Sequence, residues 1–495
     1  MRKAGRVAPL GLTLDATASE PLHRQIGAEL RRAILERRLA AGTVLPSSRL
    51  MAVELACARG TVLLALESLI AEGYIVARPG SGIAVAADLP DEMLASPAPT
   101  APEHAARPAG SGLSQRSRIR SAEMTGAGPN AAFRIGQPDL DAFPFPLWAK
   151  LLEAEWRRPP RDVAGLPHPF GHAGLRAAIA EHLGVMRGFR CDPSAVVVTS
   201  GIRQGIALLA RLLLDPGEEA WMEEPGFPGI RDALAATGVR SVAVPIDEHG
   251  FSLERAEAVA PRARLAVVAP GHHFPLGTML SLPRRLALLG WAERTGGWIV
   301  EDDYDGEYRY AGRPLAPLRA LDRSGRVAFV GSFSKLLFPA LRLSYLVLPQ
   351  SLAGPAAAAM QAAPGGASLL GQGALARFIA EGHFAAHLRR TRRLYAERQA
   401  ALIEAVQRHL AGVLEVRADP GGMHLVARPH PDAVAGFDEQ RAIRAAVSVD
   451  IAPSRLTSCY AAAPAQSGLL LGYAATPTAA IGPAVKRLRS ALRPE

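Results

Sequence analysis

The sequence predicts a multidomain protein: a small N-terminal winged helix-turn-helix module, followed by a large C-terminal α/β domain that ends in a smaller α+β subdomain. Two observations favour this fold class. The 495 residues are too many for one compact unit. Helical periodicity dominates the first part of the chain, whereas short β-branched runs later alternate with amphipathic stretches. We expect the module at 1–87, a linker at 88–130 and the large domain at 131–495, with the small subdomain starting at about residue 368.

The composition excludes several classes of protein. Hydrophobic residues make up 49% of the chain and charged residues 21%, which excludes global disorder. The net charge of +10 suits a polyanionic partner but is modest over this length. Three scattered cysteines offer neither a disulfide framework nor a cysteine zinc site. Neither a signal sequence nor a transmembrane run is present, so we expect a cytoplasmic protein without membrane contact.

The N-terminal module begins with two predicted helices. Apolar residues at helical spacing predict a first helix over Gln25–Leu39. Ser47 or Ser48 supplies the N-cap of a second helix, whose apolar face we expect to include Leu50, Val53 and Leu55.

A third helix and a wing complete the module. Cys57-Ala58 makes a short turn before a helix over Thr61–Ile70, and two short strands with a glycine-rich tip follow. In a winged helix-turn-helix the third helix presents its first residues to base edges, and the wing tip approaches the sugar-phosphate backbone. The candidate DNA-binding residues at these positions are Arg49, Arg59, Thr61, Gly80 and Gly82.

The charge of the module supports this interpretation. Eleven basic residues stand against seven acidic ones up to Ala87, as expected of a surface for duplex DNA. The alternative for any of these arginines is a solvated helix surface. We favour that alternative for Arg31, Arg32, Arg37 and Arg38, and DNA contact for Arg49 and Arg59.

Four segments of the module resemble the winged-helix head of GntR-type regulators. They are Pro21–Ile26, Leu45–Arg49, Arg59–Val62 and Glu72–Gly73. The resemblance implies binding to double-stranded operator DNA. Gly60 replaces a usual polar residue and His23 a usual tyrosine, so the base preference cannot be deduced.

The C-terminal domain shows the pattern of a parallel α/β sheet. Strands buried on both faces and separated by helices are typical of that arrangement. The candidate strands lie at 195–199, 265–269, 298–300 and 327–330, and those of the small subdomain at 414–416, 424–427 and 469–471.

Lys335 is a candidate for forming a Schiff base. A lysine after a strand, among hydroxyl and apolar residues, is partly desolvated, which lowers the pKa of its amine and favours imine formation with an aldehyde. Ser332 and Ser334 can hydrogen-bond a phosphate, and Arg342 can add a bidentate charge. The spacing alone leaves open an ordinary lysine in a surface loop.

Other segments favour a cofactor site. Gly201, Ile202 and Arg203 lie between a strand and a helix, where free amides and the helix dipole attract a phosphate. Asp302 and Tyr304 follow a strand; a carboxylate can keep a pyridine nitrogen protonated and a phenol can bond the 3-oxygen of the ring. The alternative for this acidic run is a hydrated loop or a hard-cation site.

An aromatic residue and a histidine-rich turn complete the candidate site. Phe227 is suited to stacking on a planar cofactor, although a lone aromatic is more often part of a core. The turn at 270–277 can bring a side chain near the same ring. No carboxylate cluster accompanies the histidines at ligand spacing, so we expect no metal.

Taken in chain order, these candidate segments of the C-terminal domain resemble the fold-type I pyridoxal-phosphate fold of aspartate-aminotransferase-like enzymes. Together with the GntR-like head, the whole chain resembles the MocR/GabR-type regulators. The resemblance implies pyridoxal 5′-phosphate as cofactor and a homodimer. It implies that Lys335 carries the cofactor imine, that Asp302 pairs with the pyridine nitrogen, and that Tyr304 bonds the phenolate oxygen. It implies stacking by Phe227, and phosphate contacts from Gly201, Ile202, Arg203, Ser332, Ser334 and Arg342.

Three positions depart from this pattern. The late strand at 469–473 lacks the arginine that clamps a substrate carboxylate in aminotransferases, and Gly229 lacks the arginine with which some relatives grip an amino-acid effector. The segment 166–171 lacks the tyrosine that in relatives reaches the phosphate of a neighbouring subunit. Arg455 is the only nearby substitute for the clamp, so a simple α-amino acid is not the expected ligand.

Three hypotheses follow from these residues. In the first, an amine effector exchanges with the Lys335 imine and changes how two heads are spaced on DNA. In the second, the protein is an aminotransferase with an accessory head, which the missing clamp disfavours. In the third, a B6 vitamer is itself the signal.

Overall fold

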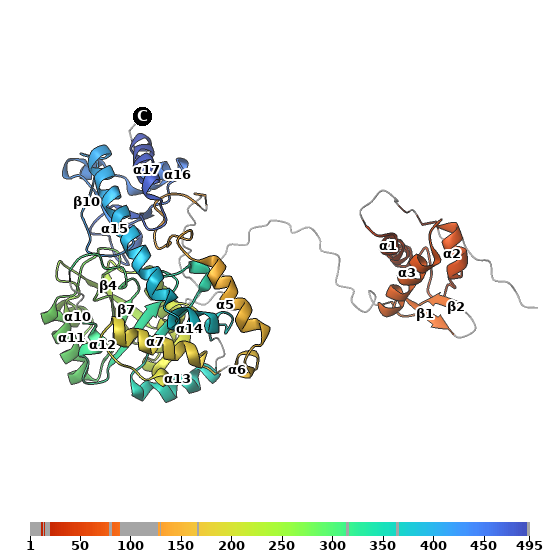
Figure 1. Ribbon diagram of the computed structural model, residues 1–495, viewed down its shortest axis with the longest axis horizontal. Helices are drawn as coiled ribbons and strands as arrows, with labels where there is room; N and C mark the ends of the chain where they lie inside the picture. The colour runs from red at the N-terminus through yellow and green to blue at the C-terminus, as the bar shows by residue number, and fades with distance from the viewer. Residues whose placement is uncertain are drawn as a thin grey trace, which may run out of the picture. The chain divides into compact units, whose positions relative to one another are not determined.

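The computed structural model describes residues 20–78, 82–89, 130–165, 168–312, 316–362 and 366–492, together with residues 11, 12, 14, 127 and 128 (Figure 1). The chain divides into two compact units, Met1–Ser111 and Gly112–Glu495. Each unit is described by itself.

The N-terminal unit is a winged helix-turn-helix, as the sequence predicts. Apolar side chains from all three helices and the wing, such as Leu30 and Leu66, form one closed core. The antiparallel wing pairs Ile75 with Val85. Its elements are α1 (Leu22–Leu35), α2 (Ser48–Glu54), α3 (Arg59–Ala71), β1 (Ile75–Arg78) and β2 (Gly82–Val85).

Local geometry explains where these helices begin and end. The Ser47 hydroxyl caps α2 by accepting a hydrogen bond from the Leu50 amide at 3.3 Å. The first helix ends at Leu35, earlier than predicted, and Arg37 then takes a left-handed φ of 58°, which no right-handed helix contains.

The predicted apolar face of α2 is wrong for Leu50 and Val53, although Leu55 packs against the core. Leu50 is 49% exposed and Val53 is 78% exposed, whereas Met51 is fully buried. Because Leu50, Met51, Val53 and Leu55 are all apolar, the spacing within this short helix does not distinguish its two faces. Packing against α1 and α3 selects Met51.

The C-terminal unit is built on a seven-stranded sheet in the order β3-β9-β8-β7-β6-β4-β5. The prediction of a parallel sheet is wrong for one strand, because β9 lies antiparallel to both neighbours. Only a short loop joins Ser332 to Ser344, and a parallel return needs a longer crossover. The strands are β3 (Val196–Thr199), β4 (Glu219–Glu224), β5 (Arg240–Pro245), β6 (Leu265–Val268), β7 (Trp298–Asp303), β8 (Val327–Ser332) and β9 (Ser344–Val347).

Helices cover both faces of this sheet. Side chains such as Val267 and Val300 pack toward α8, α9 and α13, while their neighbours Ala266 and Ile299 pack toward α10, α11 and α12. Helices α5, α7 and α14 cover the β3-β9-β8 end. The bounds are α5 (Phe145–Arg157), α6 (Arg161–Ala164), α7 (Ala173–Met186), α8 (Ile202–Leu213), α9 (Pro228–Ala236), α10 (Leu253–Val259), α11 (Leu282–Thr295), α12 (Leu318–Leu321), α13 (Gln350–Ala362) and α14 (Gln372–Ala380).

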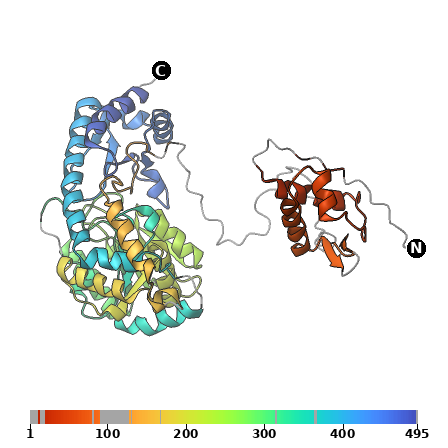
Figure 2. The same cartoon turned by 45° about the vertical axis from the view of Figure 1, so that its right-hand side comes forward.

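A smaller α+β part follows, reached through the long helix α15 that Figures 1 and 2 show running between the two parts of the unit. Its antiparallel sheet has the order β10-β11-β13-β12. The three predicted strands are present, and the two-residue β12 was not predicted. The elements are α15 (His383–His409), β10 (Leu414–Val416), β11 (His424–Pro429), α16 (Glu439–Ser448), β12 (Ser454–Arg455), β13 (Leu469–Gly472) and α17 (Thr478–Ala491).

Short 3₁₀ turns punctuate the unit at Pro193–Ala195, Pro339–Leu341, Pro431–Gly436 and Thr457–Cys459. Within the part of the chain that the structure describes, no helix has both the length and the apolar character needed to span a bilayer.

A buried ion pair joins α15 to the segment before α5. Arg398 Nη2 lies 2.6 Å from Asp139 Oδ2, and Arg398 also donates to the carbonyl of Ala474. The other oxygen of Asp139 accepts hydrogen bonds from the amides of Asp141 and Ala142. Each buried charge therefore has a partner of opposite charge within the protein. Removing one of the two leaves the other buried without a counter-charge.

We expect Asp139→Asn to destabilise the C-terminal unit by about 3 kcal/mol, because the buried Arg398 loses its counter-charge. The exposed pair Glu153–Arg157 gives a matched control, and Glu153→Gln should change the unfolding free energy by less than about 0.5 kcal/mol. Urea unfolding followed by circular dichroism measures both values. Equal stability of the two variants would contradict the importance of the buried pair.

Candidate functional site

A cavity lies where the carboxyl ends of the central strands meet. Because β9 alone is reversed, the loops after the other six strands gather at one edge, where α/β proteins place their ligands. The cavity has about 700 Å³ of empty space. Six predicted site residues line it: Lys335, Asp302, Tyr304, Phe227, Ile202 and Ser332. Five other residues complete the lining: Ile135, Gly136, Phe274, Met423 and His424.

Lys335 follows β8 and points into this cavity. Its Nζ donates a hydrogen bond to the Gly136 carbonyl at 2.9 Å. Burial lowers the pKa of the Lys335 amine, and the carboxylates of Asp305 and Asp302 only partly oppose this effect. A larger share of the amine is therefore uncharged and nucleophilic than for an exposed lysine.

Gly136 makes the position of this amine possible. A Cβ at Gly136 would overlap Lys335 Nζ, and the residue has a left-handed φ of 66°. Any side chain there would displace the lysine.

Asp302 faces the cavity from the end of β7. Its Oδ1 is buried and has no hydrogen-bond partner among the residues that the structure describes. Burial raises the pKa of Asp302 well above its usual value, and the neighbouring carboxylates of Asp303 and Asp305 add to the rise. A buried oxygen of this kind needs a cationic or donor group from a ligand, since leaving it unpaired is costly.

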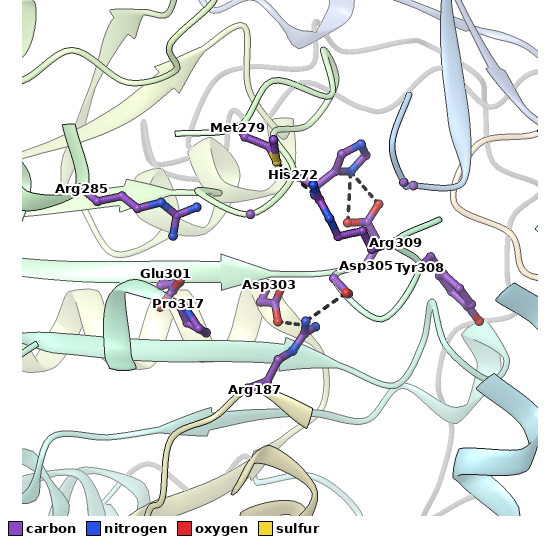
Figure 3. Close-up of a pocket in the computed structure, with 14 residues that line it drawn as sticks. Arg187, His272, Met279, Arg285, Glu301, Asp303, Asp305, Tyr308, Arg309 and Pro317 are labelled. Atoms are coloured by element: carbon purple, nitrogen blue, oxygen red, sulfur yellow. Dashed lines mark hydrogen bonds and ion pairs between the residues drawn. The ribbon is translucent and has the colours of Figure 1, made fainter. Parts of the chain in front are cut away.

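The neighbouring Asp303 points to the opposite side of the strand (Figure 3). It lies 2.6 Å from Arg187 Nη2, which also contacts Glu307, while Arg187 Nη1 donates to the Gly306 carbonyl. Successive residues of a strand face opposite sides, so only one aspartate of the pair reaches the cavity. Asp303 belongs to a separate polar pocket.

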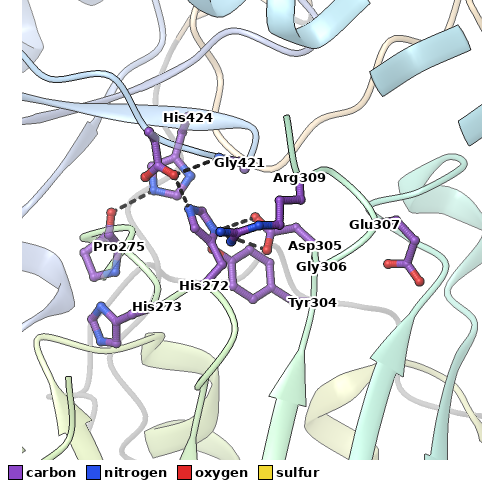
Figure 4. Close-up of polar contacts among 12 residues, drawn as sticks. His272, His273, Pro275, Tyr304, Asp305, Gly306, Glu307, Arg309, Gly421 and His424 are labelled. Atoms are coloured by element: carbon purple, nitrogen blue, oxygen red, sulfur yellow. Dashed lines mark hydrogen bonds and ion pairs between the residues drawn. The ribbon is translucent and has the colours of Figure 1, made fainter. Parts of the chain in front are cut away.

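A cationic histidine supports the Tyr304 side of the cavity (Figure 4). His272 Nδ1 lies 2.9 Å from Asp305 Oδ2 and 3.0 Å from the Tyr304 hydroxyl, and Nε2 lies 3.0 Å from Asp419 Oδ1. Burial lowers the pKa of His272, but the carboxylates of Asp305 and Asp419 outweigh it and raise this pKa well above its usual value. The imidazolium joins the loop after β6 to the loop before β11.

The start of α8 provides an anion site. The first α8 amide that donates to a preceding carbonyl is that of Gln204, which bonds Gly201. The amides of Gly201, Ile202 and Arg203 have no acceptor among the described residues. Together with the helix dipole and the buried Ser332 hydroxyl, they favour a phosphate.

Four predicted phosphate contacts, Gly201, Arg203, Ser334 and Arg342, are not among the residues that line the cavity. The Arg203 side chain is 60% exposed and lies 3.6 Å from Asp232. Arg342 is exposed, and Ser334 is half-buried outside the cavity lining.

Phe227 forms an aromatic wall. Its ring meets Phe274 edge-on, with centroids 5.7 Å apart. A Cβ at Gly229 would lie 2.5 Å from the Phe227 ring and 2.7 Å from Arg203, so the glycine leaves room for this ring position.

Of the candidate DNA-binding residues, Arg49, Arg59 and Thr61 lie at the start of helices in the N-terminal unit, and Gly82 is the first residue of β2. Arg49 and Arg59 are exposed, and Arg59 Nε donates to the Ser48 hydroxyl at 3.2 Å. Thr61 is half-buried. Gly82 has a left-handed φ of 88°, and Gly80 lies outside the described residues. Three arginines assigned to the solvated surface pair with nearby glutamates: Arg31 with Glu72, Arg32 with Glu29 and Arg38 with Glu36.

Comparisons with known proteins agree with both units. A model of bacterial regulatory proteins of the gntR family matches residues 22–85, and a model of aminotransferase class I and II matches residues 132–488. The probable rhizopine catabolism regulatory protein MocR of Rhizobium meliloti is 40% identical over 97% of this chain and 95% of its own length. The pyridoxine biosynthesis transcriptional regulator PdxR of Corynebacterium glutamicum is 31% identical over 85% of this chain and 86% of its own length.

Solved structures show the same architecture for the C-terminal unit. LysN, the α-aminoadipate aminotransferase of Thermus thermophilus complexed with N-(5′-phosphopyridoxyl)-L-leucine, has a TM-score of 0.69 and 27% identity. The match covers 77% of this chain and 97% of LysN.

A DNA-binding head on an aminotransferase-fold domain defines a class of transcriptional regulators that depend on pyridoxal 5′-phosphate. This chain belongs to that class: it is a member of the MocR-type regulators, with a GntR head and a C-terminal domain of the aminotransferase class I and II family. The cavity fits the cofactor. A buried amine, an unpaired carboxylate oxygen and an anion site at a helix start match its aldehyde, ring nitrogen and phosphate.

The sequence indicated the turn at 270–277, which contributes Phe274, but it did not indicate the other four residues of the lining. Met423 and His424 come from β11 and the residue before it, and Ile135 and Gly136 come from the segment before α5. Each is distant in sequence from the lysine segment, and no motif in the chain marks them. Only the folding of the small part over the sheet brings them together.

We expect Asp302→Asn to weaken pyridoxal phosphate binding by about 10-fold or more, because a charge-assisted hydrogen bond to the ring nitrogen is lost. Asp303→Asn is the matched control: it should lower the melting temperature through Arg187, yet change cofactor affinity by less than about 3-fold. Fluorescence titration and thermal unfolding measure the two effects. The assignment fails if Asp303→Asn proves the more damaging to cofactor binding.

Proposed function

We propose that the head binds operator DNA and that the C-terminal unit senses an amine or a B6 vitamer through Lys335. The observation that carries this proposal is the desolvated amine of Lys335, which lies in a cavity opposite the unpaired oxygen of Asp302. When bound, pyridoxal phosphate supplies an aldehyde that a primary amine can attack and a ring that can accept electrons.

Each residue of the site has its own role toward the cofactor. Lys335 would supply the uncharged amine that holds the aldehyde carbon of the cofactor, and an effector amine would compete with it for that position. Asp302 holds a proton at the ring nitrogen, and Tyr304 donates to the ring oxygen. The amides at 201–203 and the Ser332 hydroxyl hold the phosphate.

The cavity wall supports a coupling from ligand to head. Phe227 and Tyr304 come from the large part of the unit, whereas Met423 and His424 come from the small part. An effector in the cavity touches both parts and favours one arrangement of them. In a homodimer, which aminotransferase-fold proteins commonly form, this arrangement alters the distance between two heads on DNA. We place this regulator in the cytoplasm, where its DNA is.

A second function has a specific observation in its favour, since the Thermus thermophilus relative is an aminotransferase. Sustained turnover of an amine with a keto acid would support it over sensing alone. Leu470, buried on the late strand where aminotransferases carry a carboxylate clamp, opposes it.

Borohydride reduction of the cofactor-loaded protein should attach the cofactor to Lys335, as measured by peptide mass spectrometry. Lys335→Ala should bind the cofactor without this attachment, and its DNA affinity should no longer respond to amines. Lys150→Ala, on the exposed face of α5, is the control and should behave like the parent protein. An unmodified Lys335 peptide after reduction would refute the sensing role.

We expect Arg59→Ala to weaken operator binding by about 10-fold, because a side chain at the start of the recognition helix is lost. Arg32→Ala removes an equal charge from the surface of α1 and should change affinity by less than about 2-fold. Gel-shift titrations at one salt concentration compare the two. Similar losses in both variants would mean that only overall charge matters.

A further inference from the structure

We propose that the cavity selects a primary amine that has a hydroxyl group and no carboxylate. The hydroxyl group donates a hydrogen bond to His424. This inference rests on the proposed role of Lys335, and it names the class of ligand for the same site. It follows from the residues that the cavity wall contains.

Apart from the Lys335 amine, the described residues of the cavity wall offer no cation for a carboxylate. Among the described residues that line it, Lys335 carries the one basic amine, and no arginine is present. The acidic groups on the wall, Asp302 and Tyr304, bring no positive charge. An ionised carboxylate taken from water into this space without a cation pays a large desolvation cost.

Leu470 occupies part of β13 close to this wall. It is fully buried in an apolar cluster with Val426 and Leu456. Ile135 and Phe274, which line the cavity, pack against the same cluster. The side of the cavity toward β13 is therefore hydrocarbon.

The guanidinium groups nearest this cluster have other partners. Arg231 donates to the Tyr460 carbonyl at 3.1 Å, and Arg428 donates to Gln466 at 3.2 Å. Arg455, the substitute suggested by the sequence, does not line the cavity.

His424 supplies a polar group of a different kind. Its Nε2 lies 2.9 Å from the Pro275 carbonyl, which can only accept, so this nitrogen carries the hydrogen (Figure 4). Burial lowers the pKa of His424, and the nearby cation of His272 lowers it further. The neutral ring then keeps Nδ1 as an acceptor, with no partner among the described residues.

These features discriminate between two substituents on a ligand. A hydroxyl donates to Nδ1 of His424 and loses little on leaving water. A carboxylate only accepts, so it cannot bond this lone pair. The wall therefore favours amino alcohols over amino acids of the same shape.

The test uses the cofactor-loaded full chain and a matched pair of ligands, trans-2-aminocyclohexanol and trans-2-aminocyclohexanecarboxylic acid. Calorimetry and the absorbance of the bound cofactor give the affinity of each. We expect the amino alcohol to bind at least about 10-fold more tightly. Equal or tighter binding of the amino acid would overturn the proposal, since a cation must then reach the ligand.

A variant assigns the preference to His424. In His424→Phe, the amino alcohol should lose about 10-fold in affinity, whereas cyclohexylamine, which lacks the hydroxyl, should change by less than about 3-fold. His430→Phe, at a half-exposed histidine of the same subdomain, should leave both affinities unchanged. Equal losses for the two amines in His424→Phe would overturn the role of His424.

Different results would contradict the sensing role of Lys335 and the proposed ligand class. If no amine of either kind alters the cofactor absorbance, while borohydride leaves Lys335 unmodified, the sensing role itself is wrong. If amines alter the absorbance and the amino acid is preferred, only the ligand class is wrong.

Discussion

The chemistry of the C-terminal unit depends on one buried amine. Lys335 sits in a cavity where burial lowers the pKa of its amine, and the Gly136 carbonyl holds its Nζ at 2.9 Å. The absence of a side chain at Gly136 creates the space for this contact. Opposite the amine, Asp302 keeps a buried oxygen without a partner among the described residues. An electrophile with a cationic ring satisfies both groups at once, which is why the cavity suits its cofactor.

The architecture explains how distant segments reach this amine. Strands β4, β6, β7 and β8 run in one direction, so the loops that carry Phe227, Tyr304 and Lys335 end at one edge of the sheet. The start of strand β11 in the small part closes the cavity with Met423 and His424. The cation of His272 lies between Asp305 of the large part and Asp419 of the small part, and thereby links them. A ligand that moves Tyr304 can disturb this link directly, because the Tyr304 hydroxyl contacts the same ring.

The same chain thus combines two kinds of recognition. The head carries exposed arginines at the starts of helices, and their positive charge suits a polyanion such as DNA. The cavity instead places a few polar groups on a mostly apolar wall, which suits a small ligand. The apolar cluster around Leu470 packs against Ile135 and Phe274 of the cavity wall, and burial lowers the pKa of His424.

The sequence by itself determined the modules and the core of the site. Turn residues and periodicity predicted the winged head, and short motifs after strands predicted Lys335, Asp302, Tyr304 and Phe227, because such signals are local in the chain. Only the tertiary structure decided what depends on contacts between distant segments. It reversed β9, exposed Leu50 and Val53, left Arg203 and Arg342 outside the cavity lining, and brought Gly136 and His424 to the lysine. The linear pattern of residues does not distinguish one helix face or one contact partner from another. The packing of distant segments against each other does.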